Sequence, residues 1–420
     1  MSEEEKEISY NQKQKEAIKK ALENNILIIT GGPGTGKTTI IETIVEIYKE
    51  IKDLTYDDLI DKIALLAPTG RASKRMSEAT NLPATTIHRF LKWNKENNEF
   101  MVNETNKDFS ELVIIDEVSM IDINLFSSLF KGITTNAKLI LVGDYNQLPS
   151  VGAGNILKDL IDCQKIDTIY LDLLYRQDEN SYINNLAHDI KNGNLSEEFL
   201  KTKNDYAFLN CSSDSILETL KTTCQRLVEK DIDQKRIQLM APMYAGINGI
   251  DNLNKELQKI FNPEDHNKNE IRYGDIVFRE NDKILQLVNM PDDNVFNGDV
   301  GYIKYIIKAA NSKSKKNEIY VDYDGNVVKY LPKDFNKIKH GFIISIHKSQ
   351  GSEFDLVIIP ICMSYYRMLY RKLIYTAITR AKKKLIIIGE ANAFRYSVDN
   401  NNEYIRKTNL CEKLKNMYND

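Results

Sequence analysis

Short apolar runs recur along the chain between longer stretches with helical periodicity. The runs are rich in Ile, Leu and Val at consecutive positions, and they form two groups, one within residues 25–172 and the other within 236–390. Strands that are apolar on both faces and alternate with helices are typical of parallel sheets covered by helices. The pattern therefore predicts an α/β protein with two parallel-sheet domains. The runs are 25–30, 62–67, 111–116, 138–143, 236–241, 341–346, 356–361 and 384–389.

Two segments interrupt this alternation. Residues 93–110 are polar and contain the only tryptophan, and they fit a small hairpin or equally well an ordinary surface loop. Residues about 268–337 hold short strand-like runs separated by Asn-Gly and Asp-Gly, which predict a small antiparallel barrel inserted in the second domain. We expect the first domain to span 1–172 and the second 173–420.

Composition narrows the class of protein. The chain has 420 residues, of which 42% are hydrophobic, and a formal charge of −3, so any nucleic-acid contact must come from locally gathered basic groups. The five cysteines show no C-x-x-C spacing, which predicts reduced thiols and no structural metal. The acidic N-terminus and the lack of a long apolar run predict a cytoplasmic protein without a membrane anchor.

The segment GGPGTGKT at 31–38 follows an apolar run and precedes a helical stretch, as the phosphate-binding motif G-x-x-x-x-G-K-[ST] requires. Glycines let backbone N–H groups surround phosphate oxygens, and the following helix adds its positive end. Lys37 is expected to reach the β- and γ-phosphates of ATP, and Thr38 to ligate Mg²⁺. The nucleotide contacts expected from this loop are Gly32, Pro33, Gly34, Thr35, Gly36, Lys37, Thr38 and Thr39.

An acid pair, Asp116-Glu117, follows the run at 111–116. The carboxyl ends of parallel strands are where such a fold places metal and water chemistry. We expect Asp116 to hold Mg²⁺ and Glu117 to act as general base on the attacking water. The nearest string to a guanine-reading Asn-Lys-x-Asp motif, at 105–108, has the wrong spacing, so guanine specificity is unsupported.

Several further strings, in order and spacing, resemble the motifs of superfamily 1B DNA helicases of the RecD-like group, the exodeoxyribonuclease V alpha-subunit family. The resemblance covers nearly the whole chain and implies two RecA-like domains with an SH3-like barrel. Longer members carry an additional N-terminal region, whereas this phosphate loop starts after 30 residues, so a short form is expected. The matching strings are YNQKQKEAI (10–18), APTGRASKRM (67–76), TTIHRFL (85–91), VGDYNQLPSVGAGNIL (142–157), LLYRQ (173–177), HKSQGSEFDLV (347–357) and LIYTAITRAK (373–382).

The resemblance implies roles for residues outside the phosphate loop. Gln14 would contact adenine, and Gln147 would sense the γ-phosphate, although Asn146 stands where the family often has Asp. Arg176 and Arg380 would stabilise transition-state charge on the phosphate. Gln350, Gly351 and Glu353 would face the nucleotide. The expected DNA contacts are Pro68, Thr69, Arg71, Thr86, His88, Trp93, His347, Lys348 and Ser349.

These roles imply an ATP-dependent helicase that moves 5′ to 3′ on single-stranded DNA, unwinds tailed or forked duplex and serves DNA repair or recombination, acting as a monomer. Two alternatives stay open. One is a translocase or remodeller without processive unwinding, similar to the phage Dda-type helicases. The other is an ATP-gated DNA-binding module that does not hydrolyse ATP.

Overall fold

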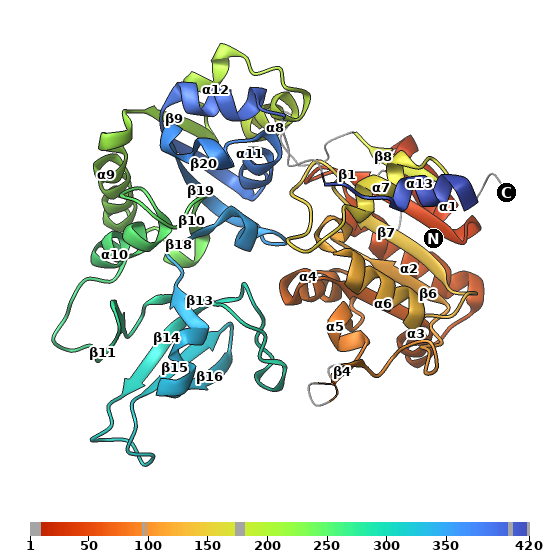
Figure 1. Cartoon of the computed structure of the whole chain (residues 1–420), viewed down its shortest axis with the longest axis horizontal. Helices are drawn as coiled ribbons and strands as arrows, with labels where there is room; N and C mark the ends of the chain where they lie inside the picture. The colour runs from red at the N-terminus through yellow and green to blue at the C-terminus, as the bar shows by residue number, and fades with distance from the viewer. Residues whose placement is uncertain (1–9, 95–96, 98, 173–180, 402–405, 418–420) are drawn as a thin grey trace. The chain divides into compact units, whose positions relative to one another are not determined.

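The computed structural model describes residues 10–94, 97, 99–172, 181–401 and 406–417, which fold as two compact units. The first unit contains the described residues up to 172 together with 406–417, and the second contains 181–401. Each unit is built around its own parallel sheet (Figure 1), so the predicted α/β class with two parallel-sheet domains is confirmed.

The first unit has a six-stranded sheet in the order β3-β2-β6-β7-β1-β8, in which every neighbouring pair is parallel. Its strands are β1 (Ile26–Gly31), β2 (Ile63–Ala67), β3 (Ala84–Thr86), β6 (Leu112–Ile115), β7 (Lys138–Gly143) and β8 (Thr168–Leu171). Its helices are α1 (Gln12–Glu23), α2 (Lys37–Lys52), α3 (Tyr56–Lys62), α4 (Gly70–Thr80), α5 (Ile87–Phe90), α6 (Ile123–Gly132), α7 (Ile156–Asp162) and α13 (Leu410–Met417).

Consecutive residues of a strand point to opposite faces of the sheet, which explains why these runs are apolar throughout. Leu27 and Ile29 pack with residues of α1, α2 and α4, whereas Ile28 between them packs with residues of α6 and α7. Both faces of the sheet are therefore covered, and the loops at the strand ends carry its polar groups.

The second unit has a parallel sheet in the order β18-β10-β19-β20-β9. Helices α9 and α10 cover one face, and α8, α11 and α12 lie on the other (Figure 1). Its strands are β9 (Tyr206–Asn210), β10 (Ile237–Ala241), β18 (Ile343–Ser345), β19 (Phe354–Ile361) and β20 (Ala381–Gly389). Its helices are α8 (Tyr182–Asn192), α9 (Ile216–Glu229), α10 (Ile250–Phe261), α11 (Arg371–Ile378) and α12 (Ala391–Asp399).

Antiparallel strands form the predicted barrel between α10 and β18. Five of them pair in the order β16-β15-β14-β13-β17, and β11 and β12 form a separate hairpin. The strands are β11 (Glu270–Tyr273), β12 (Ile276–Arg279), β13 (Lys283–Gln286), β14 (Val300–Ile307), β15 (Glu318–Tyr323), β16 (Asn326–Tyr330) and β17 (Ile338–His340). In the first unit, β4 (Trp93–Asn94) pairs with β5 (Glu99–Phe100), so of the two alternatives for this segment the small hairpin is the one present.

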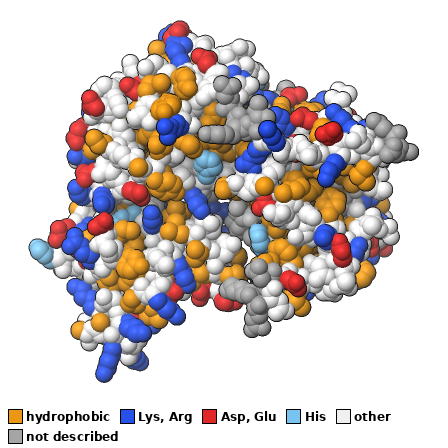
Figure 2. Space-filling view, viewed as in Figure 1, with side chains coloured by type: hydrophobic (Ala, Val, Ile, Leu, Met, Phe, Trp, Pro, Cys, Tyr) orange, Lys and Arg blue, Asp and Glu red, His pale blue; other side chains and the backbone are white. Residues whose placement is uncertain are grey.

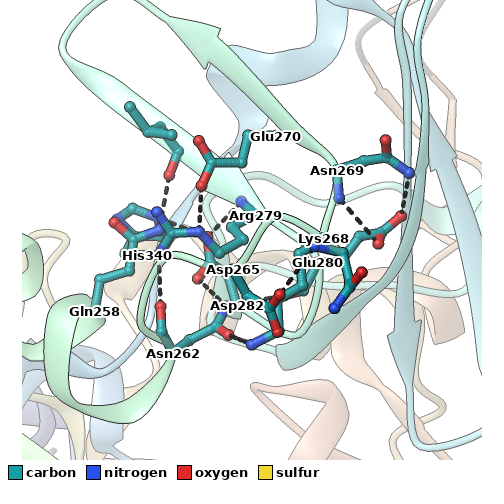
Figure 3. Close-up of polar contacts among 12 residues, drawn as sticks. Gln258, Asn262, Asp265, Lys268, Asn269, Glu270, Arg279, Glu280, Asp282 and His340 are labelled. Carbon is teal, nitrogen blue, oxygen red and sulfur yellow. Dashed lines mark hydrogen bonds and ion pairs between the residues drawn. The ribbon is translucent and has the colours of Figure 1, made fainter.

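A buried polar cluster joins the barrel to α10 (Figure 3), and we call its members Gln258, Asn262, Arg279, Asp282 and His340 the polar joint. Asp282 is fully buried, and its Oδ2 accepts from Gln258 Nε2 at 2.8 Å and from the Arg279 N–H at 2.6 Å. His340 Nε2 lies 3.1 Å from the same oxygen, and Asn262 Nδ2 donates to Oδ1 at 2.8 Å. One carboxylate thus connects the helix, two barrel strands and the turn between β12 and β13.

The polar face of α10 continues beyond the joint. Asn254, Gln258 and Asn262 are spaced four residues apart, so they lie in one row along the helix. Asn254 exchanges two hydrogen bonds with the backbone of Ile343 at the start of β18. The barrel is therefore held to α10 by the same row of side chains that holds α10 to the second sheet.

The C-terminal segment corrects the expected domain boundary. We expected the second domain to run to residue 420, but residues 406–417 belong to the first unit. Leu410 and Leu414 of α13 pack against the apolar cluster that contains α7, and Thr408 Oγ1 donates to Asp159 at 2.8 Å. Arg406 donates to the backbone of Ser150. The chain thus leaves the first unit, forms the second and returns.

Candidate functional site

The phosphate loop lies between β1 and α2. Gly36 is the N-cap of α2 and has φ of +83°, a left-handed conformation that side chains with a Cβ rarely adopt. Lys37 Nζ donates to the carbonyls of Gly31 and Gly32, each at 2.8 Å, and Thr35 Oγ1 donates to Gly32 at 2.8 Å. The loop therefore curls around the lysine ammonium. When a nucleotide binds, its phosphate oxygens would replace these carbonyls as acceptors of the ammonium's hydrogen bonds.

Gln14 supports this loop from α1. With Asn11 it forms a reciprocal cap at the start of the helix, and its Nε2 donates to the Thr35 carbonyl at 3.2 Å. A Cβ on Gly36 would lie 2.4 Å from that nitrogen. Gln14 thus packs directly on the phosphate loop, while its adenine contact stays a prediction.

The acid pair follows β6. Burial raises the pKa of Asp116 to about 6; the neighbouring Glu117 acts in the same direction, and Lys37 and Arg75 oppose it. Glu117 has φ of +53°, and its Oε1 lies 3.4 Å from Arg75 Nη2. The predicted metal ligand, which is half-buried, and the predicted base, which is buried, are therefore neighbours with two cations close to them.

Gln147 lies after β7, the neighbour of β6. Its Nε2 donates to Asp144 Oδ2 at 3.2 Å, and Asp144 also caps the Asn146 N–H at 3.0 Å. The Oε1 of Gln147 and the hydroxyl of Ser119 are buried and make no hydrogen bond within the described part of the chain. Buried polar atoms without partners are uncommon, and they fit a site that a polar ligand completes.

Sheet order brings these groups together. Strands β6, β7 and β1 are adjacent, and Thr30 at the end of β1 pairs with Gly143 at the end of β7. Because the carboxyl ends of parallel strands meet at one edge, the phosphate loop, the acid pair and Gln147 lie along the same edge. The structure thus gathers the predicted first-domain nucleotide residues into one site.

The same edge continues into the predicted nucleic-acid contacts. Ala67 at the end of β2 pairs with Thr86 at the end of β3. Thr69 and Thr86 cap α4 and α5 by accepting from backbone N–H groups, each at 3.3 Å. Pro68, Arg71 and His88 belong to these same turns and helices. Hydroxyl-rich helix starts of this kind suit phosphate groups.

Aromatic side chains gather at the hairpin. The Trp93 ring is 42% exposed and meets Phe100 edge-on with ring centroids 4.8 Å apart, and the His88 ring lies 5.9 Å from Phe100. Exposed rings of this kind can stack on unpaired bases. Lys and Arg side chains on the visible face of the molecule are interspersed with acidic ones (Figure 2).

In the second unit, the polar bend after β18 forms a short 3₁₀ turn, Ile346–Ser349. Burial lowers the pKa of Lys348, whose Nζ donates to Asn297 Oδ1 of the barrel at 2.5 Å. Burial, with Lys348 next to it, also lowers the pKa of His347. Both side chains remain partly exposed, so they are available to a ligand.

The position of Ser349 does not agree with the DNA contact predicted for it. We expected its hydroxyl to contact DNA, but the residue is fully buried, and Oγ donates to the Ile346 carbonyl at 2.7 Å. A serine that follows a turn often satisfies the turn's own carbonyl, and this need outweighs exposure here. Its role is to hold the turn that presents His347 and Lys348.

The remaining predicted residues of the second unit lie close to the same turn. Arg380 donates to the carbonyls of Thr376 and Ser352, at 3.2 and 3.1 Å, and Glu353 lies 3.5 Å from Lys382 Nζ. Gln350 and Gly351 are buried, and Gly351 has φ of +70°. Arg176 lies outside the described residues.

Two residues near the site have no distinctive signal in the sequence, Arg75 and Asn297. Arg75 was only one basic residue among several in a helical stretch, and its sole signal was its position four residues after Arg71, on the same face of a helix. Asn297 belongs to a turn-like Asn-Gly pair in the barrel, and nothing in the local sequence pointed to its contact with Lys348.

Among the described residues, no helix is long and apolar enough to cross a membrane.

Three family models match successive parts of the chain. An AAA domain matches residues 14–153, an ATP-dependent RecD-like DNA helicase SH3 domain matches 253–323, and a UvrD-like helicase C-terminal domain matches 340–388. The second model covers most of the barrel, and the third begins at its last strand and ends within β20.

The chain is similar to curated proteins over most of its length. It is 31% identical to the ATP-dependent RecD2 DNA helicase of Deinococcus radiodurans over 392 residues, 93% of this chain and 50% of that protein. It is 27% identical to the RecBCD enzyme subunit RecD of Buchnera aphidicola over 463 residues, 91% of this chain and 73% of that protein. The chain thus spans about half the length of the Deinococcus relative.

Solved structures of Pif1 helicases share the fold. The Candida albicans Pif1 helicase aligns with a TM-score of 0.54 at 17% identity, covering 98% of this chain and 100% of that one. Bacteroides Pif1 bound to single-stranded DNA aligns with a TM-score of 0.55 at 15% identity, covering 98% and 97%. At this identity the likeness is one of fold.

Proposed function

We propose that the chain belongs to the RecD-like superfamily 1 helicases and is an ATP-dependent DNA helicase that moves along single-stranded DNA and separates the duplex ahead of it; the matching family models and relatives support this proposal. The observation that carries the proposal is the strand order β3-β2-β6-β7-β1. Three of these strands end at the predicted nucleotide residues, and the other two end next to Thr69 and Thr86. One sheet edge would therefore carry both the proposed ATP site and the proposed DNA contacts.

The residues present fit Mg-ATP. The Lys37 ammonium donates to two carbonyl oxygens, and the buried Oε1 of Gln147 accepts no hydrogen bond from the described residues. Thr38 and Asp116 would hold Mg²⁺, a cation that prefers oxygen ligands. When bound, Mg²⁺ would neutralise charge on the terminal phosphates.

Glu117 is the proposed general base, and it would take a proton from the attacking water. Arg380 and Arg176 keep the transition-state role that the family resemblance implies. Thr69, Arg71, Thr86 and His347 would contact phosphates of the strand, which carry no sequence information and so suit movement along any sequence.

We also propose that the chain moves 5′ to 3′ and acts as a monomer on tailed or forked duplex. Its proposed biological role is DNA repair or recombination. A fluorescent strand-displacement assay with ATP tests the first part, using duplexes with a 5′ or a 3′ tail of DNA or RNA. Displacement from the 5′ DNA tail alone is the expected result. Hydrolysis stimulated by single strands without displacement from any tail would instead indicate a translocase.

The chemical assignment has its own test. Glu117→Gln keeps the size and polarity of the side chain but removes the base, so the variant should bind ATP and DNA while losing turnover by about two orders of magnitude or more. Normal turnover in this variant would overturn the assignment. Nucleotide-dependent DNA binding without phosphate release in the unaltered chain would indicate a binding module.

A further inference from the structure

Arg75 links the predicted strand contacts to the predicted base. Its guanidinium Nη2 lies 3.4 Å from Glu117 Oε1. The Arg75 side chain is 36% exposed and the Glu117 side chain 10%, so Arg75 is the more exposed of the two partners and lies between the carboxylate and solvent. Arg75 belongs neither to the phosphate loop nor to the acid pair; it comes from α4.

Helix α4 starts at the proposed strand contacts. Thr69 is its N-cap, and Arg71 lies in its first turn. Arg75 follows Thr69 by six residues, which is about 9 Å along a helix at 1.5 Å per residue. The helix is anchored by Ala72, Ser73 and Met76, which are buried. Thr69 and Arg75 lie on the same short helix, so a tilt of α4 about these buried positions by a bound strand would also move Arg75.

The contact is well suited to opening. A tight hydrogen bond between charged groups measures about 2.7–2.9 Å, so at 3.4 Å this one is already long and a small shift breaks it. Glu117 has φ of +53° and ψ of +41°, a left-handed backbone that is unfavourable for a residue with a Cβ.

We propose that Arg75 is a positioning residue that restrains the Glu117 carboxylate until a single strand binds at the start of α4. Strand binding moves α4, the contact opens and Glu117 becomes available to the attacking water. The inference rests on the proposed function, and it assigns stimulation of hydrolysis by single-stranded DNA to a specific contact inside the first unit.

The test compares ATP hydrolysis with and without saturating oligo-dT. Arg75→Ala should raise the rate without DNA about fivefold or more while keeping the rate with DNA within about twofold, so that the stimulation ratio collapses. Arg75→Lys, which keeps the charge, should restore part of the ratio. Lys74→Ala removes the same charge from an exposed neighbour on α4 and should leave the ratio unchanged. In the double variant with Glu117→Gln, the extra turnover should vanish.

A second readout does not depend on turnover. Hydrogen exchange of the backbone amides of Val118–Met120 should rise when oligo-dT binds the unaltered chain in the presence of a non-hydrolysable ATP analogue. In Arg75→Ala these amides should exchange at the higher rate without DNA.

The inference is overturned if Arg75→Ala lowers both hydrolysis rates equally, if it changes neither, or if exchange in that variant matches the unaltered chain without DNA. The proposed function fails separately, in the unaltered chain, if oligo-dT does not stimulate hydrolysis. In that case the exchange experiment still decides whether Arg75 restrains the segment after Glu117.

Discussion

Replacing Asp282 should weaken the second unit more than any exposed substitution, because the polar joint converges on its carboxylate. Asp282→Ala removes the acceptor of four donors. Gln258 and Asn262 each keep a second acceptor, in the carbonyls of Val277 and Glu280. The Arg279 N–H and the His340 ring lose the partner that Asp282 provides.

The magnitude follows from these losses. A buried donor left without a partner costs about 1–3 kcal/mol, and Asp282→Ala leaves two such donors, the Arg279 N–H and the His340 ring. We therefore expect Asp282→Ala to lower the free energy of unfolding of the second unit by about 4 kcal/mol. Asp282→Asn keeps the shape and loses only one acceptor, so it should cost about 1–2 kcal/mol.

Urea unfolding measures this effect unit by unit. Trp93 is the only tryptophan and lies in the first unit, so its fluorescence follows that unit, while far-ultraviolet circular dichroism follows both. With a slope of about 2 kcal/mol per molar urea, Asp282→Ala should lower the midpoint of the second transition by about 2 M and leave the Trp93 transition in place.

The matched control is Asp275→Ala, which removes an exposed acid from the turn between β11 and β12 and should cost less than about 0.5 kcal/mol. A midpoint for Asp282→Ala that stays within the range of this control would refute the view that the carboxylate holds the barrel on α10. An equal shift of both transitions would show that the loss is not confined to the second unit.

Three further predictions concern the first unit. Gly36→Ala should weaken ATP binding at least about tenfold in calorimetry, since φ is +83° and the new Cβ would meet Gln14. The pKa of Asp116 is raised to about 6, so the folded state holds its proton longer than the unfolded chain, and metal-free stability falls as pH rises from about 4 to 6. Asp116→Asn should therefore raise the free energy of unfolding at pH 8 by up to about 3 kcal/mol, seen as a higher Tm, and change it little at pH 4. The same variant should abolish ATP hydrolysis. Leu414→Ala should lower first-unit stability by about 1–2 kcal/mol in urea, because this half-buried side chain docks α13.

Local patterns predicted the features that depend on local sequence. The eight apolar runs all contain strands, because a strand buried on both faces leaves an unbroken apolar signature. The glycine and lysine spacing at 31–38 likewise predicted the loop, since its backbone conformation is set within eight residues. The short β3 and the edge strands β8 and β9 were missed, since they are short or partly exposed and lack that signature.

Features that depend on distant contacts could not be read in this way. Asn254, Gln258 and Asn262 look like the solvent-facing side of an amphipathic helix, but β18 partners Asn254 and the barrel partners Gln258 and Asn262, which makes them a buried row. Ser349 stands in a polar string and is nevertheless buried, because the turn uses its hydroxyl. The short α13 has two leucines to dock, and nothing nearby in the sequence tells which unit receives them.

The return of the chain to the first unit has a consequence during synthesis. The six-stranded sheet is complete once β8 has emerged, but α13, which covers part of α7, follows only after the whole second unit has been made. Domains generally fold as units while the chain is still growing, so the nascent first unit must wait with an uncovered apolar patch. Ribosome-bound chains stopped before α13 should therefore recruit holding chaperones through α7, and release should coincide with the arrival of the last helix.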